Sequence, residues 1–404
     1  MAKTVHLHIG TPKSGTTYVQ SILLGNRERL ADRAGLLCAG DTWGDLVNAA
    51  RDVLSDGRNP QARGAWERIT QQIDAWSGDA AVITMEWLGS VRTEQARRMV
   101  ESLRPSDVKV IVTARDLART IPAAWQEFCQ NAETWSWPEF LRAVTADRPM
   151  STEAGSLFWT QQDLGKMLAV WTDVLSPEDV TVVTVPPPGS IPNLLWARFA
   201  DALGLPSAET LDLVGAGTNA SLGLESAELM RRLNLVSKRE NVDRRQYERV
   251  FKARLAKRVL SRRRPQEHTL RLPAEYAGWV AAKSEAMVAQ VRAHRVRVCG
   301  DLADLVAEPG EVGATSTEVS DGELLEAALE GLVGLGRLLS GEVQAARRQL
   351  EAAHQAAADG AAEVARLQSK PFKRALVSVS ERHRSLTRLR TVWWRLANLA
   401  RRGR

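Results

Sequence analysis

The 404-residue chain has few cysteines and no long apolar run. Its three cysteines, Cys38, Cys129 and Cys299, lie far apart and show no metal-ligand spacing. An odd number in a long chain disfavours a disulfide framework and favours a reducing compartment. No stretch approaches the roughly 20 apolar residues of a membrane-spanning helix, and the first expected strand begins too early for a signal peptide. We therefore expect a cytoplasmic protein with no metal site.

Acidic residues are scarce at the C-terminal end. Residues 369–404 contain eleven lysines and arginines but a single acid, Glu381, and so carry +10. Since the whole chain carries +6, the remainder carries −4. Leucines and the pair Trp393 and Trp394 lie between the basic residues, as in interfacial helices. We interpret 369–404 as a basic amphipathic tail that binds the anionic inner face of the membrane rather than nucleic acid. A solubilising tail is the alternative.

The N-terminal stretch 4–21 has the pattern of a strand, a turn and a helix. Apolar and polar side chains alternate over 5–9, as in a β-strand, and glycine and proline residues follow over 10–15. A helix is expected to begin at Thr16. The free N–H groups and the dipole of such a helix favour an anion in the loop. Lys13 adds a positive charge, and Thr16 and Thr17 add hydroxyl groups.

This loop differs from that of nucleoside triphosphatases, in which a lysine follows the last glycine. Here Thr16 follows Gly15, and Lys13 comes two places before it. The segment Pro-Lys-Ser-Gly-Thr-Thr at 12–17 instead resembles the 5′-phosphosulfate-binding loop of sulfotransferases that use 3′-phosphoadenosine-5′-phosphosulfate (PAPS). The resemblance implies a P-loop-like α/β fold and a PAPS-binding loop formed by Thr11, Pro12, Lys13, Ser14, Gly15, Thr16 and Thr17.

Three further apolar runs, at 80–85, 109–113 and 180–185, have the composition of buried parallel strands. Together with the strand at 5–9 they alternate with expected helices. This pattern predicts a parallel sheet with helices on both faces. Ligands of such sheets bind beyond the carboxyl ends of the strands. Glu86 and Arg115 each follow a strand and are therefore expected near the N-terminal loop.

The resemblance also implies roles for these residues. Lys13 would stabilise the charge that develops on the leaving phosphate. Glu86 occupies the place of a glutamate that acts as general base in the carbohydrate-modifying branches, and Arg115 matches an arginine that binds the 3′-phosphate of PAPS. The alternatives are a cap or surface carboxylate for Glu86 and a structural ion pair for Arg115.

One part of the family pattern is missing after Arg115. The family has a serine eight residues beyond the arginine, where this chain has Ala123, and Pro122 falls in the first turns of the expected helix. Thr120 is a candidate substitute for the missing hydroxyl. This departure leaves the binding of a 3′-phosphate less well supported than the binding of the 5′ group.

Aromatic and basic residues suggest further functional surfaces. The stretches 41–43 and 158–164 combine tryptophan with polar groups, which suits either stacking on a sugar or ordinary core packing. Residues 238–264 hold twelve lysines and arginines against three acids. They form either a basic wall near an anionic cofactor or a solvated helix face, and we favour the solvated face.

Composition divides the chain into an α/β domain at 1–306 with a helical insertion at about 219–300, a linker at 307–321, a helical segment at 322–368 and the tail. Apolar residues recur in steps of three and four over 322–352, which predicts self-association through a heptad-like helix. The glycines within it each cost about 1 kcal/mol relative to alanine and weaken that prediction.

Together these observations predict a sulfotransferase that moves a sulfuryl group from PAPS to a hydroxyl group, leaving 3′-phosphoadenosine-5′-phosphate. The carboxylate base and the basic tail favour a carbohydrate or glycolipid acceptor. Two other hypotheses remain, a P-loop kinase or NTPase and a non-catalytic nucleotide-binding scaffold.

Overall fold

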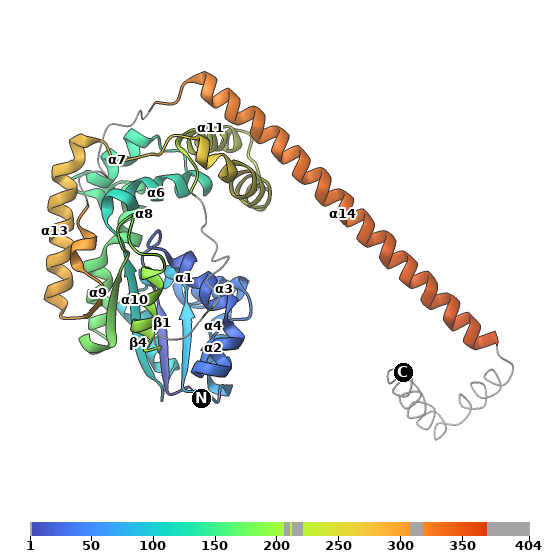
Figure 1. Cartoon of the computed structure of the whole chain (residues 1–404), viewed down its shortest axis with the longest axis horizontal. Helices are drawn as coiled ribbons and strands as arrows, with labels where there is room; N and C mark the ends of the chain where they lie inside the picture. The colour runs from blue at the N-terminus through green and yellow to red at the C-terminus, as the bar shows by residue number, and fades with distance from the viewer. Residues whose placement is uncertain (1, 206–210, 212–220, 308–317, 370–404) are drawn as a thin grey trace. The chain divides into compact units, whose positions relative to one another are not determined.

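A six-stranded parallel sheet lies at the centre of the first of two structural units, Met1–Leu332 (Figure 1). Its strand order is β2-β3-β1-β4-β5-β6, and every neighbouring pair is parallel. The strands are β1 (Thr4–His8), β2 (Leu36–Cys38), β3 (Ala80–Thr84), β4 (Asp107–Ala114), β5 (Val180–Thr184) and β6 (Arg297–Cys299). The predicted α/β class is confirmed.

This computed structural model describes residues 2–205, 211, 221–307 and 318–369. The helices up to β5 are α1 (Thr16–Gly25), α2 (Arg27–Ala34), α3 (Trp43–Leu54), α4 (Ala65–Ala75), η1 (Glu86–Ser90), α5 (Thr93–Ser102), α6 (Leu117–Gln130), α7 (Trp137–Thr145), η2 (Pro149–Ser151), α8 (Glu153–Gln162), α9 (Leu164–Thr172) and η3 (Pro177–Asp179). After β5 come α10 (Leu194–Leu203), α11 (Leu224–Arg239), α12 (Arg244–Gln246), the π-helix η4 (Tyr247–Val259), η5 (Leu260–Gln266), η6 (Ala274–Tyr276), α13 (Ala277–His294), η7 (Leu302–Leu305) and α14 (Asp321–Ser369).

Helices cover both faces of the sheet. On one face, apolar side chains of α1, α2 and α10 form a core with Val82, Ile111 and Val183 of three strands. On the other, α9 packs on β5 and also contacts α5 and α13. This two-sided cover explains why β3 and β5 are nearly continuous apolar runs. β1 alternates instead, and its polar residues His6 and His8 are buried.

Two short strands were not predicted. β2 lies between the expected strands at 5–9 and 80–85, and β6 lies near the end of the expected α/β domain at 1–306. Each is three residues long, too short for a periodic signal. Each is held by parallel pairing with a longer strand: β2 pairs with β3, with Leu36 opposite Ala80, and β6 pairs with β5, with Val298 opposite Val182.

The observed helices bear on two features noted in the sequence, Pro122 and the stretch 158–164. Helix α6 continues through Pro122 without interruption. In α8, Phe158, Trp159 and Gln162 are all buried, so the core-packing interpretation of 158–164 is correct and the sugar-stacking one is wrong.

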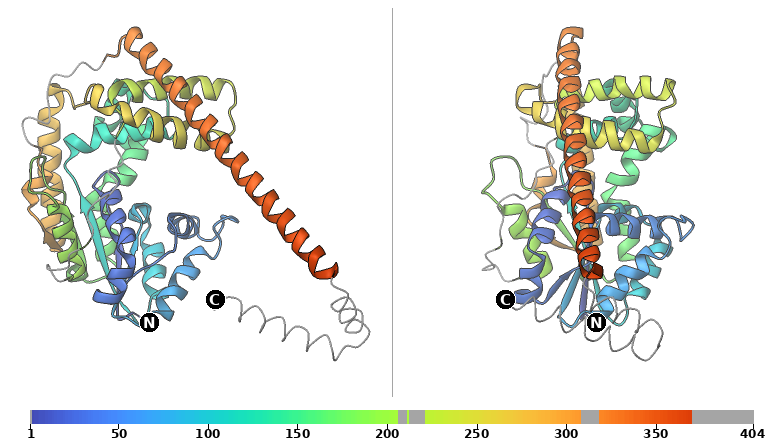
Figure 2. Two further views of the ribbon diagram at one scale, coloured as in Figure 1. Left: turned by 45° about the vertical axis from the view of Figure 1, so that its right-hand side comes forward. Right: turned by 90° about the vertical axis from the view of Figure 1, so that its right-hand side faces the viewer.

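The second unit comprises Val333–Arg404. Its described part belongs to α14, which is a single helix despite Gly331, Gly334, Gly336 and Gly341 (Figure 2). The proposed linker falls largely outside the described residues, as does the basic tail from residue 370 onward. Among the helices that the structure describes, none has the length and apolar character required to traverse a membrane.

Candidate functional site

The loop between β1 and α1 is fastened to the end of β4. The N–H group and the hydroxyl of Thr11 both donate to the carbonyl of Thr113, at 2.9 and 3.3 Å. The Ser14 hydroxyl donates to the Thr11 carbonyl at 2.5 Å and lies 2.7 Å from the Thr113 hydroxyl. Thr11 and Ser14 are buried, so these two predicted ligand side chains support the loop instead of lining the pocket.

Two glycines of the loop have no room for a side chain. A Cβ atom at Gly10 would lie 1.9 Å from Thr113 Oγ1, and one at Gly15 would lie 2.4 Å from Leu195 Cδ2. Gly15 also has a φ of +79°, a conformation that glycine adopts without steric cost. The first N–H groups of α1 therefore begin immediately after a tight turn and lack intrahelical partners.

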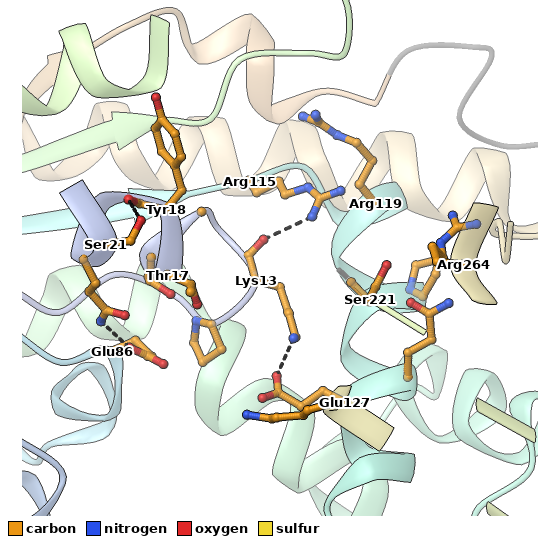
Figure 3. A pocket seen from close by; sticks show the side chains of 18 of the residues that line it. Lys13, Thr17, Tyr18, Ser21, Glu86, Arg115, Arg119, Glu127, Ser221 and Arg264 are labelled. Carbon is orange, nitrogen blue, oxygen red and sulfur yellow. Dashed lines mark hydrogen bonds and ion pairs between the residues drawn. The ribbon is translucent and has the colours of Figure 1, made fainter. Parts of the chain in front are cut away.

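A pocket of about 1030 Å³ opens beside this loop (Figure 3). It is lined by seven of the predicted site residues: Pro12, Lys13, Gly15, Thr16, Thr17, Glu86 and Arg115. Thr120 does not line it. That side chain is buried, and its hydroxyl has no hydrogen-bond partner in the part of the chain that the structure describes. Pro122 and Ala123 line the wall where the family pattern has a serine.

Lys13 points into the pocket from a left-handed backbone conformation with φ of +68°. Its ammonium nitrogen lies 3.0 Å from Oε2 of Glu127, a second carboxylate of the pocket, contributed by α6. Its carbonyl oxygen accepts a hydrogen bond from Arg115 Nη1 at 3.2 Å. The amide of Gln162 donates to the carbonyl of Pro12 at 2.9 Å, so the last residue of α8 also supports the loop.

Glu86 is the first residue of η1, directly after β3, and its carboxylate lines the same pocket. Gln20 of α1 donates to its Oε2 at 2.9 Å. Burial raises the pKa of Glu86, the hydrogen bond from Gln20 opposes that shift, and the charge of Glu127 adds to it. Glu86 is therefore a partly buried carboxylate with raised basicity rather than a solvated surface group.

Arg115 and Arg119 bring two guanidinium groups to the wall formed by the end of β4 and by α6. Arg119 is fixed in place, since it pairs with the carboxylate of Asp116 and donates to the carbonyl of Pro186 at 3.1 Å. Asp116 in turn caps α6 by accepting from the Arg119 N–H group at 2.9 Å. This wall faces the loop at the carboxyl ends of the strands, as the strand-end argument predicts.

Four further basic residues of the pocket were not predicted as site residues: Lys252, Lys257, Arg264 and Arg271. Lys252 and Lys257 come from η4 and Arg264 from η5, all within the stretch that we interpreted as a solvated face. Lys252 and Arg264 are partly buried, so that interpretation is wrong for them, whereas Lys257 lines the pocket and is also exposed. Burial, and secondarily the charge of Lys257, lowers the pKa of Lys252. The charge density of 238–264 was the available signal, but sequence alone does not show which way these helices face.

The pocket mouth carries exposed aromatic side chains. Trp43 and Trp87 line it and are 43% and 39% exposed. The guanidinium carbon of Arg51 lies 5.7 Å from the ring centroid of Trp87. Tyr18 also lines the pocket and donates from its hydroxyl to Asn193 at 3.0 Å. Of the stretch 41–43, Trp43 lines the pocket, whereas Asp41 and Thr42 are not among its lining residues.

Comparison with known proteins finds one distant structural similarity and no matching family or curated sequence. No family model matches the chain, and no curated protein matches its sequence. Among solved structures it is similar to the crystal structure of a sulfotransferase from Alicyclobacillus acidocaldarius, with a TM-score of 0.37 and 14% identity, over 61% of this chain and 100% of that chain. Similarity at this level identifies no function, which has to be argued from the pocket itself.

Proposed function

We propose that this protein is a sulfotransferase that transfers a sulfuryl group from PAPS to a hydroxyl group of its acceptor. The observation that carries the proposal is the composition of one pocket. It brings the loop between β1 and α1, seven basic side chains and a partly buried carboxylate of raised pKa into a single space. A polyanionic donor fits the excess of positive charge, and the carboxylate supplies the base that an attacking hydroxyl requires.

The residues present suit the two anionic ends of PAPS. Lys13, the hydroxyls of Thr16 and Thr17 and the free N–H groups of α1 would hold the 5′-phosphosulfate. Arg115 would hold the 3′-phosphate without the serine partner of the family pattern, with the neighbouring Arg119 adding positive charge. When bound, the donor supplies the activated sulfuryl group.

The chain's own groups then divide the remaining work. Glu86 accepts the proton of the acceptor hydroxyl, which makes the oxygen a better nucleophile. Gln20 keeps the Glu86 carboxylate in one orientation. Lys13 faces the negative charge that accumulates on the departing phosphate oxygen, and a fixed cation in a partly buried site lowers the energy of that charge.

The acceptor class is proposed from the mouth of the pocket. Trp43 and Trp87 offer aromatic faces beside polar and charged groups, a combination suited to the C–H faces and hydroxyls of a carbohydrate or a glycolipid headgroup. The predicted basic tail would hold such a protein near an anionic membrane, and the protein would act at its cytoplasmic side.

Calorimetric titration with 3′-phosphoadenosine-5′-phosphate tests the proposal. We expect this bisphosphate to bind more tightly than AMP or Mg-ATP, and the Lys13→Ala and Arg115→Ala variants to bind it at least about tenfold more weakly, since a charged hydrogen bond contributes about 1.5–3 kcal/mol. Lys3→Ala is the control, because Lys3 pairs with Asp79 on the surface.

A preference for Mg-ATP would contradict the proposal and indicate a kinase or NTPase. Binding of the bisphosphate without transfer from PAPS to any of a panel of hydroxyl acceptors would indicate the scaffold instead.

A further inference from the structure

Helix α14 carries an apolar seam with a strict heptad spacing. The seam runs from Leu325 to Leu367. Successive seam residues are alternately four and three residues apart. They are Leu325, Leu329, Leu332, Gly336, Leu339, Val343, Ala346, Leu350, Ala353, Ala357, Gly360, Val364 and Leu367. All are apolar or glycine, over a helix of 49 residues.

The seam is distinct from the face by which α14 packs on its own unit. In the first turns, Leu324 and Ala327 are 6% and 0% exposed, and a Cβ atom at Gly331 would lie 3.3 Å from Leu255 and Leu260. Seam residues of the same turns, Leu325 and Leu332, are 60% and 67% exposed. At about 100° per residue, the packed face and the seam point in clearly different directions. The seam is therefore not used for packing in the first unit.

We propose that this seam binds the same seam of a second copy of the chain, as a parallel, in-register two-stranded coiled coil. A repeat of 3.5 residues keeps its apolar stripe in contact only with a partner helix that supercoils around it with the same repeat. A second α14 has that repeat over the whole length. A flat apolar surface or a membrane suits the wider stripe of an ordinary amphipathic helix.

One charged pair at the seam's edges favours the parallel orientation. If Leu329, Val343 and Leu350 occupy the a positions, Glu342 is at g and Arg347 is at the following e. In a parallel dimer the g residue of one helix faces this e residue of its partner, which pairs Glu342 with Arg347 on both sides. The small residues of the second half of the seam let the two helices approach closely.

Light scattering of the full chain during size-exclusion chromatography tests the dimer. We expect twice the chain mass of 44.5 kDa, falling to the monomer value on dilution. The double variant Val343→Asp/Leu350→Asp should be monomeric. Its control, Ala345→Asp, should remain dimeric. Ala345 comes two residues after Val343, which places it about 200° around the helix axis, on the side away from the seam. Both changed side chains of the double variant are more than half exposed, so the first unit should fold normally.

Cysteine cross-linking tests the register. The native cysteines are buried, so Val343→Cys introduces an accessible thiol at an a position. Under mild oxidation it should form a disulfide-linked dimer, whereas Ala345→Cys should not. The Arg347→Glu change should weaken the dimer, and adding Glu342→Arg should restore it.

A chain that is monomeric at its highest soluble concentration would overturn the proposal. So would a dimer that survives the double variant, because another surface would then hold it together. A dimer in which Val343→Cys fails to cross-link, or in which the charge reversal has no effect, would overturn the parallel register.

Discussion

The ammonium group of Lys13 and the carboxylate of Glu127 form an ion pair inside the pocket, with 3.0 Å between Nζ and Oε2. Lys13 is the only basic residue of the loop at 9–15, and Glu127 comes from the distant helix α6. Both side chains remain partly exposed. An anion at the loop therefore competes with Glu127 for the lysine.

Replacing Glu127 by glutamine should strengthen anion binding. The substitution keeps the shape of the side chain, removes one negative charge from the pocket and releases Lys13. Because partly exposed ion pairs contribute up to about 1 kcal/mol, we expect the Kd for 3′-phosphoadenosine-5′-phosphate to fall roughly two- to fivefold. Titration calorimetry measures it, with Glu94→Gln as a surface control. Weaker binding by the Glu127→Gln protein would mean that the carboxylate positions Lys13 for the ligand.

Replacing Glu86 by glutamine should abolish turnover and leave donor binding intact. Glutamine can still accept the hydrogen bond from Gln20, but it cannot take a proton from an acceptor hydroxyl. We expect the transfer rate to fall about 10²- to 10⁴-fold at unchanged affinity for the bisphosphate. A steady-state assay together with calorimetry measures both quantities. An unchanged rate would remove Glu86 from the mechanism.

The same variant should be more stable than the parent protein at neutral pH. The pKa of Glu86 is raised by burial above its ordinary value of 4.5, so its ionised form is disfavoured in the folded state. The stabilisation provided by the protonated form is complete below pH 4.5 and is lost as the pH rises through the folded-state pKa. Denaturant unfolding at a series of pH values should show the variant's advantage growing over this range. A constant difference at all pH values would contradict the assignment.

Lys252 should take up protons when an anion binds in alkaline solution. Its pKa is lowered by burial and by Lys257, and a bound phosphate nearby would raise it again. Over a series of alkaline pH values the measured binding enthalpy should therefore come to depend on the ionisation enthalpy of the buffer. Lys252→Met should lose this dependence and retain weaker binding. If the dependence persists in that variant, another group of the pocket is responsible.

Trp43 and Trp87 should affect the acceptor and not the donor. Both lie exposed at the mouth of the pocket. Since an aromatic contact contributes about 0.5–1.5 kcal/mol, replacing either with alanine should raise the KM for a carbohydrate acceptor roughly two- to tenfold, with an unchanged Kd for the bisphosphate. Trp66→Ala is a suitable control, because Trp66 donates to Ser102 away from the pocket. Equal losses in donor affinity would argue that these residues shape the whole pocket.

The sequence was most informative where one short segment determines its own structure. The apolar runs located β3 and β5 within a residue of their observed ends, and the turn glycines placed the start of α1 at Thr16. Glu86 and Arg115 could be found because strand ends of a parallel sheet converge. These inferences need only the local sequence pattern and the rule that the carboxyl ends of parallel strands meet at one edge of the sheet.

Residues that reach the pocket from separately packed helices were harder to find. Glu127, Lys252 and Arg264 lie on helices whose orientation depends on long-range packing, and nothing local distinguishes their pocket-facing side chains from solvated ones. Thr11 and Ser14 show the opposite case. They fit the binding motif, but the loop turns their hydroxyls inward to β4. A motif gives the residue types of a loop and not the direction of each side chain.

His8 lies beneath the loop and bears on how the site responds to acid. Its ring nitrogens contact the hydroxyls of Thr84 and Thr113 at 2.8 and 3.2 Å, and Thr113 is the residue to which the loop is fastened. Burial lowers the pKa of His8 to about 3, so the imidazole stays neutral over the range in which Glu86 takes up its proton. Under the proposed function, acidification would therefore stop proton transfer to Glu86 while leaving the loop's fastening to β4 intact, and donor binding would outlast turnover.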